Sequence, residues 1–365
     1  TVPIVFEDCN ENGLWDACEI ADGTLIDTDA DGISDDCDGC PNDPDKTESG
    51  ICGCGSPDSG DADSDGILDC VDPCPNWPYD CSEDGQTLFV AVGQSIQLAI
   101  DAVPSGGTIE IASGTYEPTS TIDPDGKAIT IRGAVDTDGE PTTVLDGTTS
   151  LRIMICQSGE GHETIIENIR FENADSGGLG GALQNIAGSS PTVTNCWFIN
   201  NRATHGAGMY NRDSSSPVVT DCLFVGNEAS VDGGGMYNYG DCPTRIIDCR
   251  FEENRNLGPW GGGLYADSNS DVEILRCTFR ANTSVEAGGS GGGVFLGNAS
   301  DAVISECTFD SNEAEVGGAI YCRISAPSLS QCSFTNNRAL YGGAMTAILA
   351  DEDISVGGCV FTGNI

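Results

Sequence analysis

Basic side chains are scarce in this sequence. Only 14 of its 365 residues are Lys or Arg, against 58 Asp and Glu, so the formal net charge is −44. Such a chain repels the phosphates of nucleic acids and of an anionic membrane surface. Long apolar runs are also missing, since the longest candidate, LRIMIC (151–156), is far shorter than the roughly 20 residues of a membrane-spanning helix. We therefore predict no nucleic-acid partner and no membrane insertion.

Cysteine and glycine, in contrast, are abundant, with 19 and 49 residues. So many Cys beside only two Lys indicate an oxidising, extracellular or cell-surface location with disulfide bonds. A zinc site is the alternative interpretation of the motifs Cys37–Cys40 and Cys52–Cys54, but no His lies near them in the sequence.

The composition changes near residue 85. Residues 1–85 hold nine Cys and 24 acidic residues against one base, Lys46, so this segment cannot bury much apolar surface. The odd number of Cys leaves one free or paired elsewhere. We predict two domains, a small Cys-rich acidic region at 1–85 and a larger one at 86–365.

Three loops of the acidic region share the spacing of a calcium-binding loop. Each has oxygen-bearing side chains at positions 1, 3, 5, 9 and 12, Gly at 6 and an apolar residue at 7 whose carbonyl completes the set. The cofactor predicted from this spacing is Ca²⁺. The predicted ligands are Asp8, Asn10, Asn12, Leu14, Asp16 and Glu19 in loop 1, Asp27, Asp29, Asp31, Ile33, Asp35 and Asp38 in loop 2, and Asp61, Asp63, Asp65, Ile67, Asp69 and Asp72 in loop 3.

These loops are not flanked by helical sequence, so we do not expect EF-hands. The motifs CPNDP (40–44) and CPNWP (74–78) follow two of them, and residues 8–80 together resemble thrombospondin type 3 repeats. That resemblance implies calcium ions wrapped by disulfide-linked turns with little other structure.

A different pattern repeats at intervals of 25 to 30 residues in the larger domain. A Cys is followed by Phe two positions later and Asn five positions later, and a glycine cluster comes next in most units. The Cys residues are Cys196, Cys222, Cys249, Cys277, Cys307, Cys332 and Cys359. An earlier unit has Ile169 in the Cys position and a displaced Asn173. A period near 27 with three strand-like stretches is one coil of a β-solenoid.

The pattern also predicts where these residues lie on a coil. Cys and Phe share one parity and point inward, and a corner falls between Val193 and Cys196. The Asn side chains form a hydrogen-bonded column at a second corner, and the glycines allow a left-handed backbone at a third. Because neighbouring Cys side chains point the same way, about 4.8 Å apart, we expect buried thiols rather than disulfides.

The beginning of this domain resembles right-handed parallel β-helices of the pectin lyase kind. A short amphipathic helix at 95–103 precedes the strand-like GTIEIASGTY and KAITIRG, and the resemblance implies that this helix covers the first coil. Residues 165–365 resemble the repeats of polymorphic outer-membrane proteins, which are bacterial surface adhesins. The predicted fold class is all-β, a right-handed parallel β-helix with a short N-terminal capping helix.

Many pectin lyase-like proteins cleave acidic polysaccharides, so we searched for a catalytic set. The best candidate is Asp221 and Asp248 beside Arg276, in the column before the ladder Cys. A solvated column with one salt bridge is the stronger interpretation of this set. We interpret His162 and His205, the only histidines, as isolated surface residues. The uniform repeats lack long inserted loops, and we predict a protein that is not an enzyme.

Two functions remain, a structural fibre subunit and an adhesin for glycans or cells. Trp260 and Tyr341 are candidates for a sugar-binding patch, although packing in turns also explains them. Two sequons place glycans at Asn298 or Asn282, and Asn298 is favoured because Asn282 belongs to the inward column. The sequence ends on an uncapped coil, FTGNI (361–365), and begins with the β-prone TVPIVF (1–6), so the predicted partner is a second copy, bound head to tail.

Overall fold

A computed structural model describes residues 8–365 except 65–66, 73, 77, 149–150 and 351–352. Two compact units make up the chain, Thr1–Gly85 and Gln86–Ile365. TVPIVF (1–6), assigned to self-assembly from the sequence, lies outside the described residues. Among the described helices, none is long and apolar enough to cross a membrane.

The first unit consists mainly of turns joined by disulfides. The bridges are Cys9–Cys37, Cys40–Cys54, Cys52–Cys70 and Cys74–Cys81, and Cys18 is the free cysteine of this unit. Its two regular elements are helix α1 (Asp16–Asp22) and the short strand β1 (Asp80–Cys81). The expectation that no helix flanks the calcium-type loops is therefore wrong for loop 1, because α1 begins at its position 9. Gly23 ends this helix with a left-handed backbone, φ 83°.

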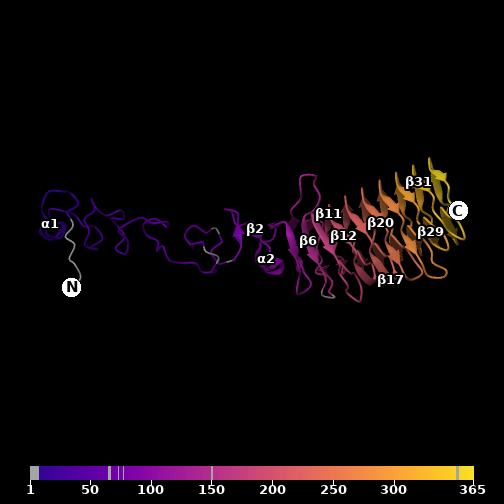
Figure 1. The fold of residues 1–365 in the computed structure, drawn as a ribbon, viewed down its shortest axis with the longest axis horizontal. Helices are drawn as coiled ribbons and strands as arrows, with labels where there is room; N and C mark the ends of the chain where they lie inside the picture. Colours follow the sequence, from indigo (N-terminus) through magenta and orange to yellow (C-terminus); the bar gives the residue numbers. More distant parts are fainter. Residues whose placement is uncertain (1–7, 65–66, 73, 77, 149–150, 351–352) are drawn as a thin grey trace. The chain divides into compact units, whose positions relative to one another are not determined.

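The second unit is a parallel β-solenoid of about nine turns with coils of about 27 residues (Figure 1). Corresponding strands of successive coils pair in parallel and in register, so each side of the solenoid is one long sheet. Sheet 1 contains β2 (Thr87–Val90), β3 (Thr108–Ile111), β5 (Thr130–Gly133), β8 (Ile165–Glu167), β11 (Thr192–Thr194), β15 (Val218–Thr220), β19 (Arg245–Ile247), β23 (Glu273–Leu275), β27 (Val303–Ser305), β30 (Ser328–Ser330) and β33 (Ser355–Gly357).

Three further sheets complete the coils. Sheet 2 contains β4 (Gly114–Tyr116), β6 (Thr143–Asp146), β9 (Ile169–Glu172), β12 (Trp197–Ile199), β16 (Leu223–Val225), β20 (Arg250–Glu252), β24 (Thr278–Arg280), β28 (Thr308–Asp310), β31 (Ser333–Thr335) and β34 (Val360–Thr362). Sheet 3 contains β7 (Met154–Cys156), β10 (Leu183–Asn185), β14 (Met209–Arg212), β18 (Met236–Tyr239), β22 (Leu264–Asp267), β26 (Val294–Gly297), β29 (Ile320–Arg323) and β32 (Met345–Ile348). Sheet 4 contains β13 (Arg202–His205), β17 (Glu228–Asp232), β21 (Arg255–Asn256) and β25 (Thr283–Ser284).

The predicted capping helix is present as α2 (Ile96–Ala102). Ser95 accepts a hydrogen bond from the N–H of Leu98 and so caps its N-terminus. Ile96, Ala99 and Ile100 are buried, while Leu98 on the opposite side is 57% exposed, which is the amphipathic division expected from the sequence.

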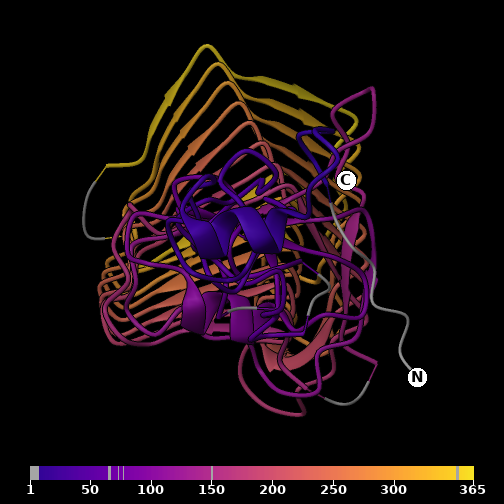
Figure 2. The same cartoon turned by 90° about the vertical axis from the view of Figure 1, so that its left-hand side faces the viewer.

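The solenoid interior is built from columns of identical residues. Rings from Phe171 to Phe361 form one continuous stack in which neighbouring centroids lie 4.5 to 5.1 Å apart. The ladder Cys from Cys196 to Cys332 are buried and all seven are free thiols, as predicted. Figure 2 shows the successive coils nearly superimposed, which explains why one sequence pattern recurs.

The corners lie where the pattern predicted them. Asn195, between β11 and β12, has a left-handed backbone (φ 46°), and the equivalent residues of the following coils share it. At the third corner Gly206 also has positive φ, and a Cβ there would lie 2.4 Å from the carbonyl oxygen of Met209. Only glycine fits that corner without displacing the backbone.

Asparagine forms the predicted ladder at the second corner. Each Nδ2 from Asn201 to Asn337 donates to the Oδ1 of the Asn one coil further on, at 2.9 to 3.0 Å. Each also donates to the carbonyl oxygen of a Phe in the preceding coil, for example from Asn254 to Phe224 at 2.8 Å. Asn173 lies outside the ladder, because Ala174 occupies the equivalent position.

Candidate calcium centres and lateral face

Loop 1 brings its predicted ligands together around Glu19, at position 12. Asn10 Nδ2 and Asn12 Nδ2 donate to the two carboxylate oxygens of Glu19, at 3.2 and 2.7 Å. Asp8, at position 1, accepts from the backbone N–H groups of Asn12 and Gly13. Positions 3, 5 and 12 therefore converge, and position 1 fixes the turn.

Asp16, at position 9, begins α1 and is 5% exposed. One of its oxygens accepts from the N–H of Cys9, and the other, Oδ1, is buried without a hydrogen-bond partner. Asp16 lies against the disulfide Cys9–Cys37, which joins loop 1 to loop 2.

Loop 2 gathers three carboxylates within one site. Asp27, Asp29 and Asp31 each have an oxygen within 4.8 Å of the others. Desolvation and the nearby charges of Asp31 and Asp38 raise the pKa of Asp29, although backbone hydrogen bonds partly oppose them. Asp38, at position 12, accepts from the N–H of Cys40 through one oxygen, and its Oδ2 is buried and unpartnered. Both oxygens of Asp35, at position 9, bind Thr28.

Loop 3 is described only in part, because Asp65 lies outside the described residues. Asp69 accepts from the N–H of Ala62, and the closing Asp72 accepts from the N–H of Cys74 while its Oδ2 is buried without a partner. Asp61 and Asp63, at positions 1 and 3, remain predicted ligands. The predicted carbonyl ligands Leu14, Ile33 and Ile67 remain predictions.

The described parts of the three loops share a left-handed backbone at position 4. The residue at position 4 has positive φ in every loop, at Glu11 (56°), Ala30 (66°) and Ser64 (65°). Gly13 and Gly32, at position 6, have φ of 88° and 100°. Non-glycine residues rarely adopt this conformation, so its recurrence shows that the shared spacing yields a shared loop.

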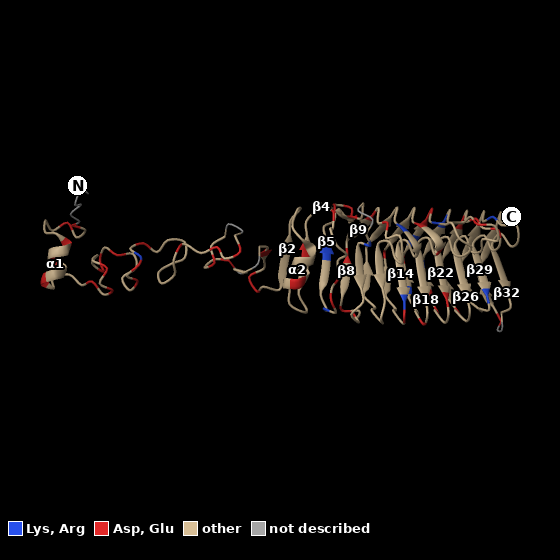
Figure 3. Ribbon diagram, turned by 90° about the horizontal axis from the view of Figure 1, so that it is seen from below, with Lys and Arg blue, Asp and Glu red and all other residues tan. Residues whose placement is uncertain are grey.

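The residues present fit a calcium ion. Several carboxylate oxygens in the loops, at Asp16, Asp29, Asp38 and Asp72, are buried and make no hydrogen bond. Clustered, partly desolvated carboxylates repel one another unless a cation lies between them. The cysteines of the two motifs considered for zinc are oxidised in disulfides, so their thiolates are not free to bind a metal. In the ribbon of Figure 3, positions of Asp and Glu, coloured red, recur along this unit.

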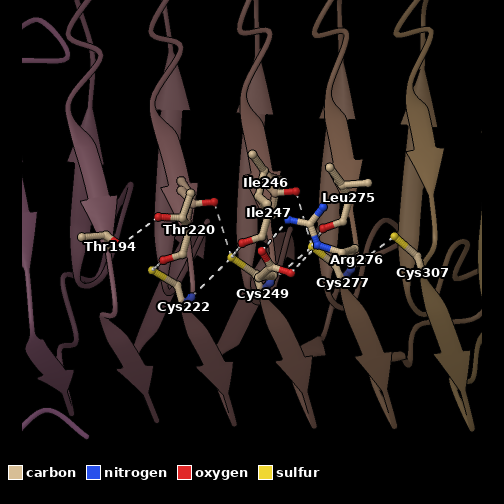
Figure 4. Close-up of polar contacts among 12 residues, drawn as sticks. Thr194, Thr220, Cys222, Ile246, Ile247, Cys249, Leu275, Arg276, Cys277 and Cys307 are labelled. Carbon is tan, nitrogen blue, oxygen red and sulfur yellow. Dashed lines mark hydrogen bonds and ion pairs between the residues drawn. The ribbon is translucent and has the colours of Figure 1, made fainter. Parts of the chain in front are cut away.

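The column considered for catalysis coincides with the first corner of the solenoid. Arg276 donates two hydrogen bonds to Asp248, at 2.7 and 2.6 Å, and this pairing lowers the pKa of Asp248 (Figure 4). Asp221, Asp248 and Arg276 all have φ near 53°, a backbone that Asn and Asp tolerate best among residues with a Cβ. The corner therefore accounts for the Asp residues without a catalytic role.

One histidine differs from its interpretation as an isolated surface residue. His162 is exposed, but His205 lies beside Asp232 and its ring contacts that of Tyr237, with 5.1 Å between the centroids. The interpretation fails for His205 because strands of adjacent coils pair in parallel. Asp232 of the next coil therefore lies directly beside His205.

The outer face of sheet 3 carries an aromatic column that we did not predict. Tyr210, Tyr237, Tyr265, Phe295 and Tyr321 stack there and are at most 8% exposed. The available signal was the Tyr or Phe that directly follows five of the glycine clusters, GAGM (206–209), GGGM (233–236), GGGL (261–264), GGGV (291–294) and GGAI (317–320). Trp260, considered for sugar binding, packs against this column and is only partly exposed, whereas Tyr341 is 62% exposed.

The two sequons occupy different environments. Asn282 is fully buried, and its Nδ2 donates to Phe251 and Asn312 in the ladder, so a glycan there would break both bonds. Asn298 lies at an exposed corner, where its Nδ2 donates to Asp267.

Comparison with known proteins identifies the larger unit. The family model described as a right-handed β-helix region matches residues 149–244 and 229–361. No curated protein sequence matches the chain.

Among solved structures, pectate lyase Pel9A aligns with a TM-score of 0.44 and 15% identity, covering 73% of this chain and 78% of the lyase. The catalytic domain of a GH87 α-1,3-glucanase in complex with tetrasaccharides aligns with a TM-score of 0.44 and 12% identity, covering 78% and 60%. ORF18 of Geobacillus virus E2 has a TM-score of 0.34 and 17% identity, covering 71% and 60%.

Proposed function

Because the chain belongs to the right-handed β-helix family, we propose that it is an extracellular structural protein, in which calcium holds the N-terminal unit and the solenoid forms the rigid part of a surface fibre. The observation that carries the calcium assignment is the recurrence of one loop conformation with buried, unpartnered carboxylate oxygens. The four disulfides of the first unit support an oxidising, extracellular location.

Calcium stabilises the first unit by replacing carboxylate repulsion with ion–carboxylate attraction. The unit has little apolar core, so ligand removal loosens it while the solenoid keeps its sheets. Two resemblances of the sequence support this proposal. Residues 8–80 resemble thrombospondin type 3 repeats, and residues 165–365 resemble the repeats of polymorphic outer-membrane proteins.

Isothermal titration calorimetry on the full chain tests the calcium proposal. We expect calcium binding that Asp29→Asn and Asp38→Asn each weaken, because both side chains lie in loop 2. Asp36→Asn is the matched control, since Asp36 is an exposed neighbour outside the predicted ligand set. Absence of calcium binding, or equal weakening by the control, contradicts the proposal.

We also propose that the partner is a second copy of the chain, bound head to tail. Strands β33 and β34 carry the exposed apolar residues Val356 (50%), Val360 (58%) and Phe361 (49%), and this contact buries them.

Analytical ultracentrifugation with calcium tests this assembly. We expect species larger than the monomer, which Val360→Lys reduces. Val303→Lys is the control because Val303 is similarly exposed (52%) on the side of the solenoid. Deletion of residues 1–6 tests whether the predicted docking segment contributes. A wild-type chain that stays monomeric at high concentration contradicts the assembly.

The adhesin alternative retains one accessible aromatic residue of the pair considered, Tyr341, and one accessible sequon, at Asn298. For the polysaccharide-cleaving alternative, the corner geometry offers a structural reason for Asp221 and Asp248. We predict that the purified protein with calcium releases no unsaturated or reducing ends from polygalacturonate. Release that Asp248→Ala abolishes would overturn this prediction.

A further inference from the structure

The pair His205 and Asp232 lies where strands β13 and β17 pair at the beginning of sheet 4. These two residues are direct partners in the parallel register, so they come from adjacent coils. Asp232 is 5% exposed and the His205 side chain is 23% exposed, so the carboxylate is inside and the imidazole lies between it and solvent.

The carboxylate of Asp232 has no adequate counter-charge. Among the ion pairs of the described residues, its one partner is His205, which is charged only when protonated. Its Oδ1 is buried without a hydrogen-bond partner. A buried carboxylate in this state is destabilising unless a cation balances its charge.

The contact between the two side chains is not a hydrogen bond. Nδ1 of His205 lies 3.2 Å from Oδ2 of Asp232, and Nδ1 makes no hydrogen bond. Two donor atoms that bind one metal ion lie close together in this way without a hydrogen bond between them, because each directs its lone pair at the ion. With bonds of about 2.1 Å, a separation of 3.2 Å subtends about 100° at the metal, between octahedral and tetrahedral values.

We propose that His205 Nδ1 and the Asp232 carboxylate bind a divalent transition metal ion of the Zn²⁺ class, which clips two adjacent coils together. An imidazole nitrogen with a carboxylate suits this class better than Ca²⁺, which takes oxygen ligands. The site is distinct from the calcium-type loops, which belong to the other unit. Two protein side chains leave positions for water or an external ligand on the exposed side of His205.

The chain offers an internal control, because it has only two histidines. Proton–carbon NMR of histidine-labelled, calcium-saturated full-length protein reports on each imidazole separately, so ions bound at the acidic loops do not interfere. Assignment follows from His162→Gln, which leaves only the His205 signal. During titration with ZnCl₂, we expect the His205 signal to change at a zinc concentration at least ~tenfold below that needed for His162.

Asp232→Asn should remove this preference, because it lowers the ligand charge with little change in shape. His205→Gln should abolish the high-affinity phase in calorimetry, while His162→Gln should retain it. If the two histidines of the wild-type protein respond at the same zinc concentration, or neither responds, the proposal is refuted regardless of how the variants fold. Survival of the His205 preference in a folded Asp232→Asn variant also refutes it.

Discussion

Replacing one asparagine in the middle of the buried ladder should destabilise the solenoid strongly. Asn254 makes four side-chain hydrogen bonds. Its Oδ1 accepts from the backbone N and the Nδ2 of Asn227, at 3.1 and 2.9 Å, and its Nδ2 donates to Phe224 O and Asn282 Oδ1, at 2.8 and 2.9 Å. Asn254→Ala removes all four from a fully buried position.

The magnitude follows from the groups that lose a partner. Two N–H groups of Asn227 lose their acceptor, whereas Asn282 Oδ1 still accepts from the backbone N–H of Asn254. At about 1–3 kcal/mol for each buried donor left without an acceptor, the expected loss is about 4 kcal/mol. For a domain of this size, that corresponds to a fall in Tm of roughly 10 °C.

Urea unfolding followed by circular dichroism, together with calorimetry, measures this loss. The matched control is Asn173→Ala, which removes the same side chain from an exposed position outside the ladder, where its Nδ2 donates only to Asp146. We expect the control to cost only about 1 kcal/mol, because residue 173 has φ 55°, a backbone that Ala tolerates less well than Asn. If the two substitutions have equal effects, the ladder is not a source of stability and the reasoning is wrong.

Three further predictions concern the ion pair of Arg276 and Asp248, the free thiols and the stacked Phe rings. Arg276 lowers the pKa of Asp248, so the small stabilisation from this exposed pair is present above pH ~4 and is lost as the pH falls through the lowered pKa of Asp248; the urea midpoints of wild type and Asp248→Asn should converge as the pH falls below that pKa. Cys18 is exposed, whereas burial raises the pKa of the ladder thiol Cys249, so a thiol reagent at pH 8 should modify Cys18 quickly and the buried ladder thiols from Cys196 to Cys332 only on unfolding; rapid modification of these buried thiols contradicts the ladder. Phe251→Ala should cost about 3–5 kcal/mol, and the same change at the exposed end of the column much less, by urea unfolding.

The sequence alone was sufficient to predict the interior columns of the solenoid. In a stack of parallel, in-register coils, each position contacts the equivalent position of the next coil. The same packing and hydrogen-bonding requirement therefore repeats about every 27 residues. The pattern of Cys196, Phe198 and Asn201 therefore predicted two inward columns and a corner ladder. The left-handed corner between Val193 and Cys196 followed from the change in side-chain parity.

The calcium-type loops were also readable from the sequence, because their predicted ligands lie within twelve consecutive residues. The helix that begins at Asp16 was not predicted, since only seven residues form it and the preceding loop dominates the local pattern. Which cysteine of the nine stays free was likewise left open, because pairing depends on how the turns approach one another.

Only the tertiary structure determined which residues of different types contact each other across adjacent coils. His205 and Asp232 are 27 positions apart and of different types, so no repeat pattern connects them, yet the register of β13 with β17 places them side by side. The burial of the outer aromatic column depended on Trp260 and its equivalents folding over sheet 3. Periodicity in the sequence determines what repeats along a solenoid, whereas the paths of its corners determine which unlike side chains come into contact.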